Sequence, residues 1–137
     1  MANTLRLEIV TPEAKTYSDD VEMVTLPGVE GEMGVYPQHV PLMTQLVPGE
    51  IIVRKDGQDV FLAVGEGFVE VTAERVAILT DMAIRSEQID EAKAEEARRQ
   101  AEARLAGKMD EAETALVNVT LAQSLAQLNV KRRHPHK

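Results

Sequence analysis

Hydrophobic and polar residues alternate along the first part of the chain, and this pattern predicts β-strands. Leu5, Leu7 and Ile9 alternate with Arg6 and Glu8. Side chains of a strand point alternately to its two sides, so this segment is expected to have one buried face. Similar short runs recur through the first half of the chain. We therefore expect an antiparallel β-sandwich of about nine or ten short strands.

Glycine and proline mark the turns between these strands. Five of the six prolines and seven of the eight glycines precede residue 68, as expected where tight turns follow one another closely. Asp56 and Gly57 lie between predicted strand segments at residues 51–55 and 60–64, and such a pair suits the positive φ angles of a type I′ hairpin turn. A second hairpin is predicted from residues 68–72 and 76–79, on either side of residues 73–75.

The pattern becomes helical after Arg85. Ser86 is a suitable cap for a helix that ends at Gly107, and Asp110 with Glu113 forms a capping-box-like start for a second helix. The first helix runs through Ile89, Ala92, Ala97, Ala101 and Leu105, and the second carries Val117, Leu121, Leu125 and Leu128 at mostly three-to-four-residue spacing. The short turn between them predicts an antiparallel hairpin. The expected domains are a β-sandwich at residues 1–85 and a helical hairpin at residues 86–137.

The face of the first predicted helix is mostly alanine, which limits how strongly the two helices can hold together. Alanine buries little apolar area, and burial contributes roughly 25 cal/mol per Å². The residue types therefore leave two alternatives equally open. Either the hairpin opens or detaches from the sandwich, or it is a small permanent helix pair packed on it.

Composition narrows the chemistry available to the chain. It has no cysteine, which excludes disulfides, zinc-thiolate sites and thiol nucleophiles and permits a reducing compartment. The N-terminal residues resemble neither a signal peptide nor a membrane anchor, so we expect mature protein from the start. Nothing in the sequence marks a carboxylate pair with shifted pKa values, or a triad, so we expect no catalytic activity.

Charge is distributed unevenly between the two parts. Residues 1–85 carry 6 Lys and Arg against 14 Asp and Glu, whereas residues 86–137 carry 9 of each. Lys131, Arg132, Arg133 and Lys137 give the C-terminal end a local positive charge. An acidic body with a small basic end is a poor binder of nucleic acid, because phosphate affinity scales with the number of cations presented together. The basic end is better suited to an acidic protein surface.

Three other features suggest sites at first reading. Gly28, Gly31 and Gly34 recur every third residue, but Pro37 and Pro41 forbid the helix that a phosphate-binding loop requires, so turns between strands are favoured. His39 lies between those prolines without a partner for triad or metal chemistry, and is expected to be structural or interfacial. His134 and His136 form a pair of possible metal ligands, but two ligands do not define a site, and we interpret both as residues of a frayed tail.

Several segments, taken in order, closely resemble the epsilon subunit family of bacterial rotary ATP synthases. The resemblance spans almost the whole chain, and its weight comes from the ordered set of segments. They are residues 5–12, 21–24, 26–42, 47–49, 65–71, 76–85 and 89–94.

The resemblance implies a non-catalytic rotor subunit at the cytoplasmic face of the bacterial inner membrane. It implies a ten-stranded sandwich that contacts the gamma subunit and the membrane ring of c subunits, with Glu32 and His39 among the partner-binding residues. It also implies a mobile hairpin that opposes ATP hydrolysis by extending into the catalytic head. Contacts with acidic loops of the catalytic beta subunits are then expected from Lys131, Arg132 and Arg133, with Arg98, Arg99 and Arg104 contributing from the first helix. Favourable capping of the second helix is the alternative role of the three terminal cations.

Some members of this family bind ATP on the folded hairpin, and the resemblance places the corresponding motif at Ile89–Ala94. This chain keeps Asp90 but has Lys93 in the arginine position, and Gln123 and Gln127 align with two further arginines. Lysine lacks the bidentate fork of arginine, and neutral glutamines attract a triphosphate weakly. We therefore expect no cofactor and a weak or vestigial ATP site at Asp90 and Lys93. This pattern argues against the alternative function, a free-standing ATP-sensing module.

Overall fold

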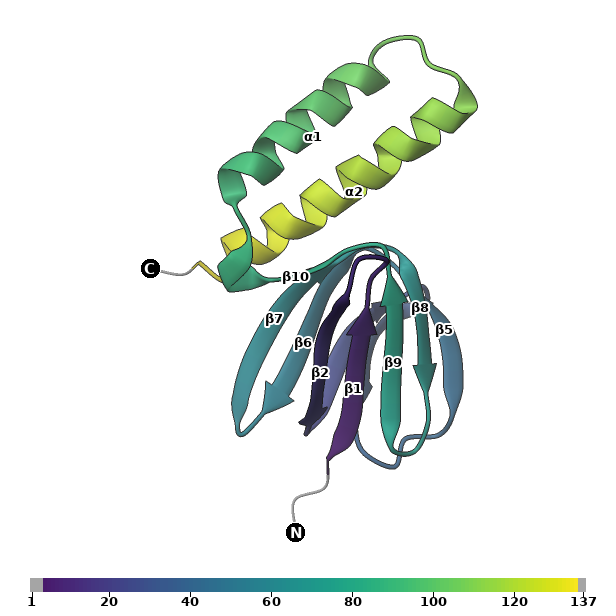
Figure 1. The fold of residues 1–137 in the computed structure, drawn as a ribbon, viewed down its shortest axis with the longest axis vertical. Coiled ribbons are helices and arrows are strands. Elements are labelled where there is room, and N and C mark those ends of the chain that lie inside the picture. The colour runs from purple at the N-terminus through teal and green to yellow at the C-terminus, as the bar shows by residue number, and fades with distance from the viewer. Residues whose placement is uncertain (1–3, 136–137) are drawn as a thin grey trace.

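The computed structural model describes residues 4–135, which form ten β-strands followed by two α-helices (Figure 1). The strands are β1 (Leu5–Val10), β2 (Lys15–Val21), β3 (Met23–Gly28), β4 (Gly31–Val35), β5 (Leu42–Leu46), β6 (Gly49–Lys55), β7 (Gln58–Val64), β8 (Gly67–Val71), β9 (Arg75–Thr80) and β10 (Ala83–Arg85). A short 3₁₀-helix, η1 (Ser86–Gln88), leads into α1 (Glu91–Leu105) and α2 (Glu111–Arg133). The predicted class, a β-sandwich followed by a helical hairpin, is confirmed.

The ten strands belong to one hydrogen-bonded sheet that folds over on itself. Its order is β10-β7-β6-β3-β5-β8-β9-β1-β2, and β4 pairs with β3 outside this path. Lys55 of β6 and Asp19 of β2 form an ion pair, which draws the β2 edge toward β6 and brings the sandwich close to a barrel. The sheet differs from the prediction in one pairing, because β1 runs parallel to β9. Alternation of side chains reports which face of a strand is buried, but it does not report strand direction.

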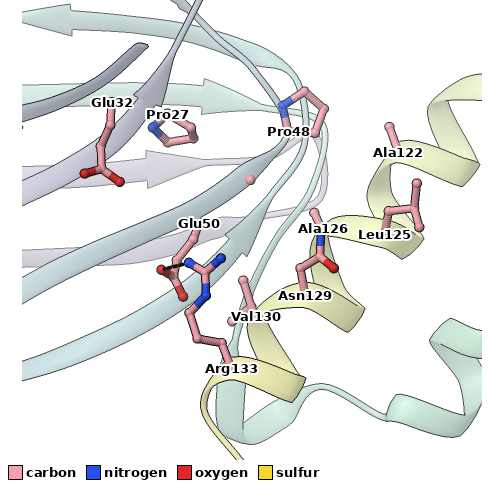
Figure 2. A pocket seen from close by; sticks show the side chains of 11 residues that line it. Pro27, Glu32, Pro48, Glu50, Ala122, Leu125, Ala126, Asn129, Val130 and Arg133 are labelled. Atoms are coloured by element: carbon pink, nitrogen blue, oxygen red, sulfur yellow. Dashed lines mark hydrogen bonds and ion pairs between the residues drawn. The ribbon is translucent and has the colours of Figure 1, made fainter.

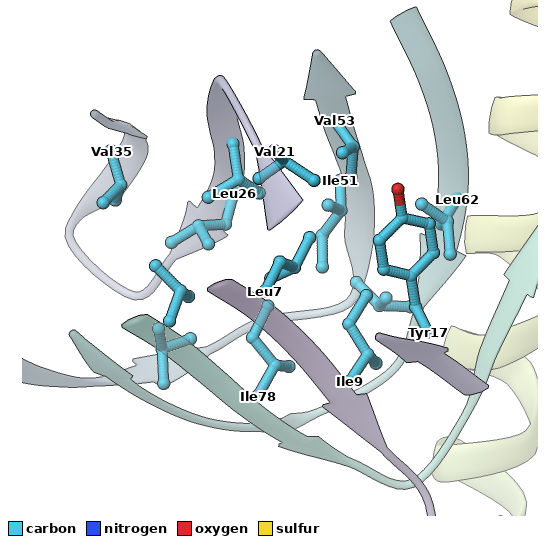
Figure 3. Packing of buried hydrophobic residues seen from close by; sticks show 14 of the residues in the cluster. Leu7, Ile9, Tyr17, Val21, Leu26, Val35, Ile51, Val53, Leu62 and Ile78 are labelled. Atoms are coloured by element: carbon cyan, nitrogen blue, oxygen red, sulfur yellow. The ribbon is translucent and has the colours of Figure 1, made fainter. Parts of the chain in front are cut away.

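The space between the two layers is filled by branched aliphatic side chains from nearly every strand (Figure 3). Leu7 and Ile9 of β1 are fully buried there, as the alternation in β1 predicts. Ile51, Leu62 and Ile78 reach the same core from β6, β7 and β9. Among residues 4–135, the helices contribute no residue to this core, so the hydrophobic driving force for folding of the sandwich is contained within the strands.

Both predicted hairpin turns are present. Asp56 and Gly57 have φ angles of 53° and 75°, and positive φ at both central residues is the signature of a type I′ turn. In the second hairpin, β8 and β9 are antiparallel, and Val71 pairs with Val76 across the turn.

The predicted start of the second helix is confirmed, and the predicted start of the first helix is not. Asp110 caps α2, since its side chain accepts a hydrogen bond from the Glu113 backbone N–H at 2.8 Å. The prediction that Ser86 caps the first helix is wrong. Ser86 begins η1, and the cap of α1 is Asp90, whose carboxylate accepts from the Lys93 N–H at 3.1 Å. Asp is as good a cap as Ser, and Asp90 directly precedes the continuous helical run.

The hairpin lies over one end of the sandwich, with α2 nearer to the strands than α1 (Figure 1). The buried residues of α1 are Ala94 and Ala101, so α1 contributes small side chains to the helix pair, as its composition suggests. On the other side, α2 contacts β6 and β7. Contact between the two domains is therefore made chiefly through α2.

Candidate functional site

The junction between α2 and the sandwich begins with a small hydrophobic cluster separate from the main core. Its buried members are Ala63 of β7, Ile89, and Ala126 and Val130 of α2. Phe61, Met82 and Ile84 are partly buried against them. Because two of the four buried side chains are alanines, the apolar area that holds α2 in place is limited.

The last turn of α2 adds a set of polar contacts to three other elements. Lys131 Nζ donates to the backbone oxygen of Ser86 at 3.2 Å. Arg132 reaches α1, where its Nε donates to Glu91 at 2.9 Å and its Nη2 to Glu95 at 3.1 Å. The three terminal cations were predicted to contact a partner, and in this structure they contact the chain itself.

Arg133 and His134 meet the same carboxylate, that of Glu50 on β6. Arg133 Nη1 donates to Glu50 Oε1 at 2.9 Å, and His134 Nε2 lies 2.7 Å from Glu50 Oε2. The Glu50 side chain is only 11% exposed. This carboxylate is therefore largely removed from water and held by two donors from the end of α2, so the contact is stronger than a pair on an open surface.

His134 corrects the sequence interpretation, which treated it as a residue of a frayed tail. Its ring stacks on Phe61 of β7, with ring centroids 3.5 Å apart and an angle of 10° between the planes. Its backbone N–H also donates to the oxygen of Val130, which continues the helical bonding to the end of α2. Glu50 and Phe61 lie far away in sequence and supply the contacts that order this end. His136 and Lys137 lie outside the described residues.

Glu95 is the most strongly perturbed carboxylate at the base of the hairpin. A hydrogen bond from Arg98 lowers its pKa to about 2, with a further contribution from Arg132. Arg98 and Arg99 both pair with Glu95 on their own helix, and Arg104 lies 3.8 Å from Glu113 on α2. These three arginines were predicted to bind a partner, and that role stays a prediction.

A groove of about 350 Å³ remains between the sandwich and α2, beside the contact between Glu50 and Arg133 (Figure 2). Pro27, Pro48 and Glu32 line it from the sandwich, and Leu125 and Asn129 line it from α2. Side chains of the two domains therefore do not interdigitate along the full length of α2, and the apolar contact is concentrated near its end.

The two candidate partner-binding residues of the sandwich lie apart. Glu32 is the second residue of β4 and borders the groove, whereas His39 follows the other end of that strand. The Nδ1 atom of His39 lies 2.7 Å from the oxygen of its neighbour Val40. The structure does not bring these two side chains into one site, and each stays a separate predicted contact.

The candidate ATP residues are either engaged within a helix or exposed to solvent. The carboxylate of Asp90 caps α1, so its local role is structural. Lys93 is exposed, and its side chain has no ion pair with the described residues. Gln123 and Gln127 are half-buried on α2. Weak or absent binding of ATP at these residues stays a prediction.

An apolar strip runs across the outer face of β5, β8 and β9. Met43, Phe68 and Leu79 are 70%, 56% and 59% exposed. Phe68 is directly paired with Leu79 and with Gln45, and Gln45 shares its face of β5 with Met43. Three large apolar side chains on adjacent strands form a patch of the kind that marks a protein interface. Sequence reasoning missed this strip, because an exposed Phe in a strand cannot be told from a buried one without the register.

Within residues 4–135, no group of three or more His, Cys, Asp or Glu side chains is placed to hold a metal ion. Over the same residues, no helix is long and apolar enough to cross a membrane. The fold and the junction define a two-domain protein in which a C-terminal helical hairpin is docked on a β-sandwich.

The comparisons with known proteins place this architecture in a family. Residues 4–86 match the model of the ATP synthase delta/epsilon chain β-sandwich domain, and residues 87–132 match that of the long α-helix domain. The chain belongs to the ATP synthase delta/epsilon chain family. The resemblance found in the sequence is thereby confirmed.

Individual relatives and structures agree with this assignment. The chain is 42% identical to an ATP synthase epsilon chain of Laribacter hongkongensis, with 92% of this chain and 91% of the relative covered. It is 44% identical to that of Chloroflexus aggregans, with 97% and 96% covered. It is similar to a chain of the Euglena gracilis mitochondrial ATP synthase, with a TM-score of 0.74, 27% identity and 92% and 79% of the two chains covered. Such relatives are non-catalytic subunits of that complex, so the expectation that the chain is not itself an enzyme is confirmed.

Proposed function

We propose that the chain is the epsilon subunit of a rotary ATP synthase, where its sandwich couples the gamma subunit to the membrane ring of c subunits. The main support for this proposal is that the buried hydrophobic side chains form two separate clusters. The main core is complete within the strands, whereas α2 rests on a separate small cluster. A rigid body with a weakly attached arm suits a subunit that is docked through one domain and moves the other. The proposed location is the membrane periphery, reached through these partners.

The proposed surface for gamma is the apolar strip of Met43, Phe68 and Leu79. Its exposed side chains lie on adjacent strands of the sandwich and do not involve the hairpin. Burial of large apolar side chains is the main source of affinity at a stable interface. Glu32 and His39 remain candidate contacts with the ring, each on a different part of the sandwich.

A pull-down with gamma tests this surface. Phe68→Glu places a charge in the centre of the strip and is expected to abolish retention of gamma by the full chain. Leu116→Glu is the matched control, because Leu116 is 71% exposed on α2. Equal retention of gamma by the two variants would exclude the strip as the docking surface.

The proposed role of the hairpin is to oppose ATP hydrolysis when it leaves the sandwich and extends. Each helix is long enough for this, since 15 and 23 residues span roughly 22 and 35 Å at 1.5 Å per residue. ATP hydrolysis by the catalytic head is measured with the full chain and with a chain that ends at Arg85. We expect both to assemble and only the full chain to inhibit. Equal hydrolysis in the two assemblies would contradict the regulatory role and leave the coupling role standing.

A further inference from the structure

The residues at the end of α2 differ from the rest of the hairpin in how they contact the molecule. Residues 111–130 of α2 carry no Lys or Arg. Besides the ion pair of Glu113 with Arg104 of α1, they meet the sandwich and α1 through apolar and small side chains. Lys131, Arg132, Arg133 and His134 then follow in succession, and each contacts an acceptor outside α2. The polar attachment of the hairpin is therefore concentrated in one turn.

Glu50 is the acceptor that connects this turn to the sandwich. Glu91 and Glu95 belong to α1 and move with the hairpin, so their bonds with Arg132 are kept if the helix pair leaves the sandwich as a unit. The bonds of Glu50 with Arg133 and His134 join β6 to α2. These bonds must break when the hairpin separates from the sandwich.

Because Glu50 is largely buried, its two hydrogen bonds are expected to stabilise the docked hairpin more than those of an exposed ion pair would. Its side chain is 11% exposed and that of His134 is 21% exposed, and the imidazole is held flat against Phe61. Lower exposure reduces screening by water and strengthens charge-assisted hydrogen bonds. The neighbouring groove leaves the middle of α2 with little apolar contact to compensate for their loss.

We propose that Glu50 is the catch of a C-terminal latch, in which Arg133 and His134 fasten the closed hairpin to β6. Closure also engages Arg133 Nη1 with Glu50, although the Arg133 side chain stays 63% exposed. Release of the latch frees this donor for an acidic partner. Only the contact of Arg133 with an acidic partner rests on the proposed function. The attachment of the hairpin to β6 is a property of the isolated chain.

The fastening is tested by distance measurement in the full chain. The protein has no cysteine, so Gln58→Cys on the sandwich and Asn118→Cys on α2 give two unique positions for spin labels. Glu50→Gln keeps the shape of the side chain and removes its charge. Loss of a hydrogen-bonded charge at this site is expected to raise the population with a long distance between labels by about tenfold.

Glu70→Gln is the matched control, because Glu70 is exposed on β8 and its side chain has no ion pair with the described residues. It removes the same charge and should leave the distances unchanged. The double variant with Glu50→Arg and Arg133→Glu restores an opposite-charge pair and should recover much of the closed population. Circular dichroism checks that every variant is folded.

A distance distribution for Glu50→Gln equal to that of Glu70→Gln would overturn the latch. The measurement also separates the latch from the regulatory role of the hairpin. If Glu50→Gln opens the hairpin but hydrolysis by the catalytic head is the same with the variant and the unmodified chain, the latch stands and the inhibitory function does not.

Discussion

The imidazole of His134 and the ring of Phe61 lie face to face, 3.5 Å apart between centroids, although 73 positions separate them in the chain. Through this stack, the residue that directly follows α2 is packed on β7. Phe61→Leu removes the aromatic partner and is expected to weaken docking of the end of α2 by about 0.5–1.5 kcal/mol. Hydrogen exchange of the His134 amide, which is bonded to Val130, should become faster. Phe68→Leu is the control, since Phe68 is on the outer strip and should leave that exchange unchanged.

The carboxyl of Glu95 should titrate far below an ordinary glutamate. Its pKa in the folded chain is about 2 against an ordinary value of 4.5, because Arg98 and Arg132 donate to the ionised form. A lowered folded pKa means that the stabilisation is present above about pH 4.5 and is lost as the pH falls from there toward 2. The chemical shift of the Glu95 carboxyl carbon, followed by NMR, measures this directly. Arg98→Gln should move the midpoint upward, and an unchanged midpoint would contradict the assigned cause.

Binding of ATP to the isolated chain is expected to be weak or absent. Lys93 is exposed, Asp90 is occupied as the cap of α1, and Gln123 and Gln127 supply no charge. Calorimetric titration with ATP should give little heat, and micromolar affinity would show this expectation to be wrong. A chain carrying Lys93→Arg, Gln123→Arg and Gln127→Arg should bind more tightly, because arginine can hold phosphate oxygens in pairs.

The main core should be far more sensitive to truncation than the hairpin surface. Leu7 is fully buried on β1, and Leu7→Ala is expected to lower the free energy of unfolding by about 2–5 kcal/mol. Leu116→Ala makes the same change at a side chain that is 71% exposed and should cost less than about 0.5 kcal/mol. Urea unfolding, followed by circular dichroism, compares the two. Similar losses in both variants would mean that the core is not confined to the strands.

Local features were predictable where the decisive residues are neighbours in sequence. The alternation in β1, the turn at Asp56 and Gly57 and the cap at Asp110 each depend on a few adjacent residues, and each is confirmed. The start of α1 was misplaced, because Ser86 and Asp90 are both good caps and the choice depends on how η1 packs.

The contacts between the end of α2 and the sandwich could not be predicted from the sequence, for a different reason. Glu50 and Phe61 carry no local sign that they meet the end of α2, and the order of His134 depends on both. Basic residues at a C-terminus are equally compatible with a solvated tail, a helix cap and a docked turn. The partner-binding roles of Glu32, His39 and the arginines of α1 come from family resemblance and stay predictions.

The parallel pairing of β1 with β9 also governs the order in which the protein can form. Leu7 pairs with Val76, so β1 obtains its second neighbour, β9, only after almost the whole sandwich has been synthesised. Until then β1 and β2 are a solitary hairpin with both outer edges unpaired, which is marginally stable in water. Closure across so many residues is slow compared with formation of the local hairpins. The hairpin helices follow the strands in the chain, so they are synthesised after every described strand of the sandwich.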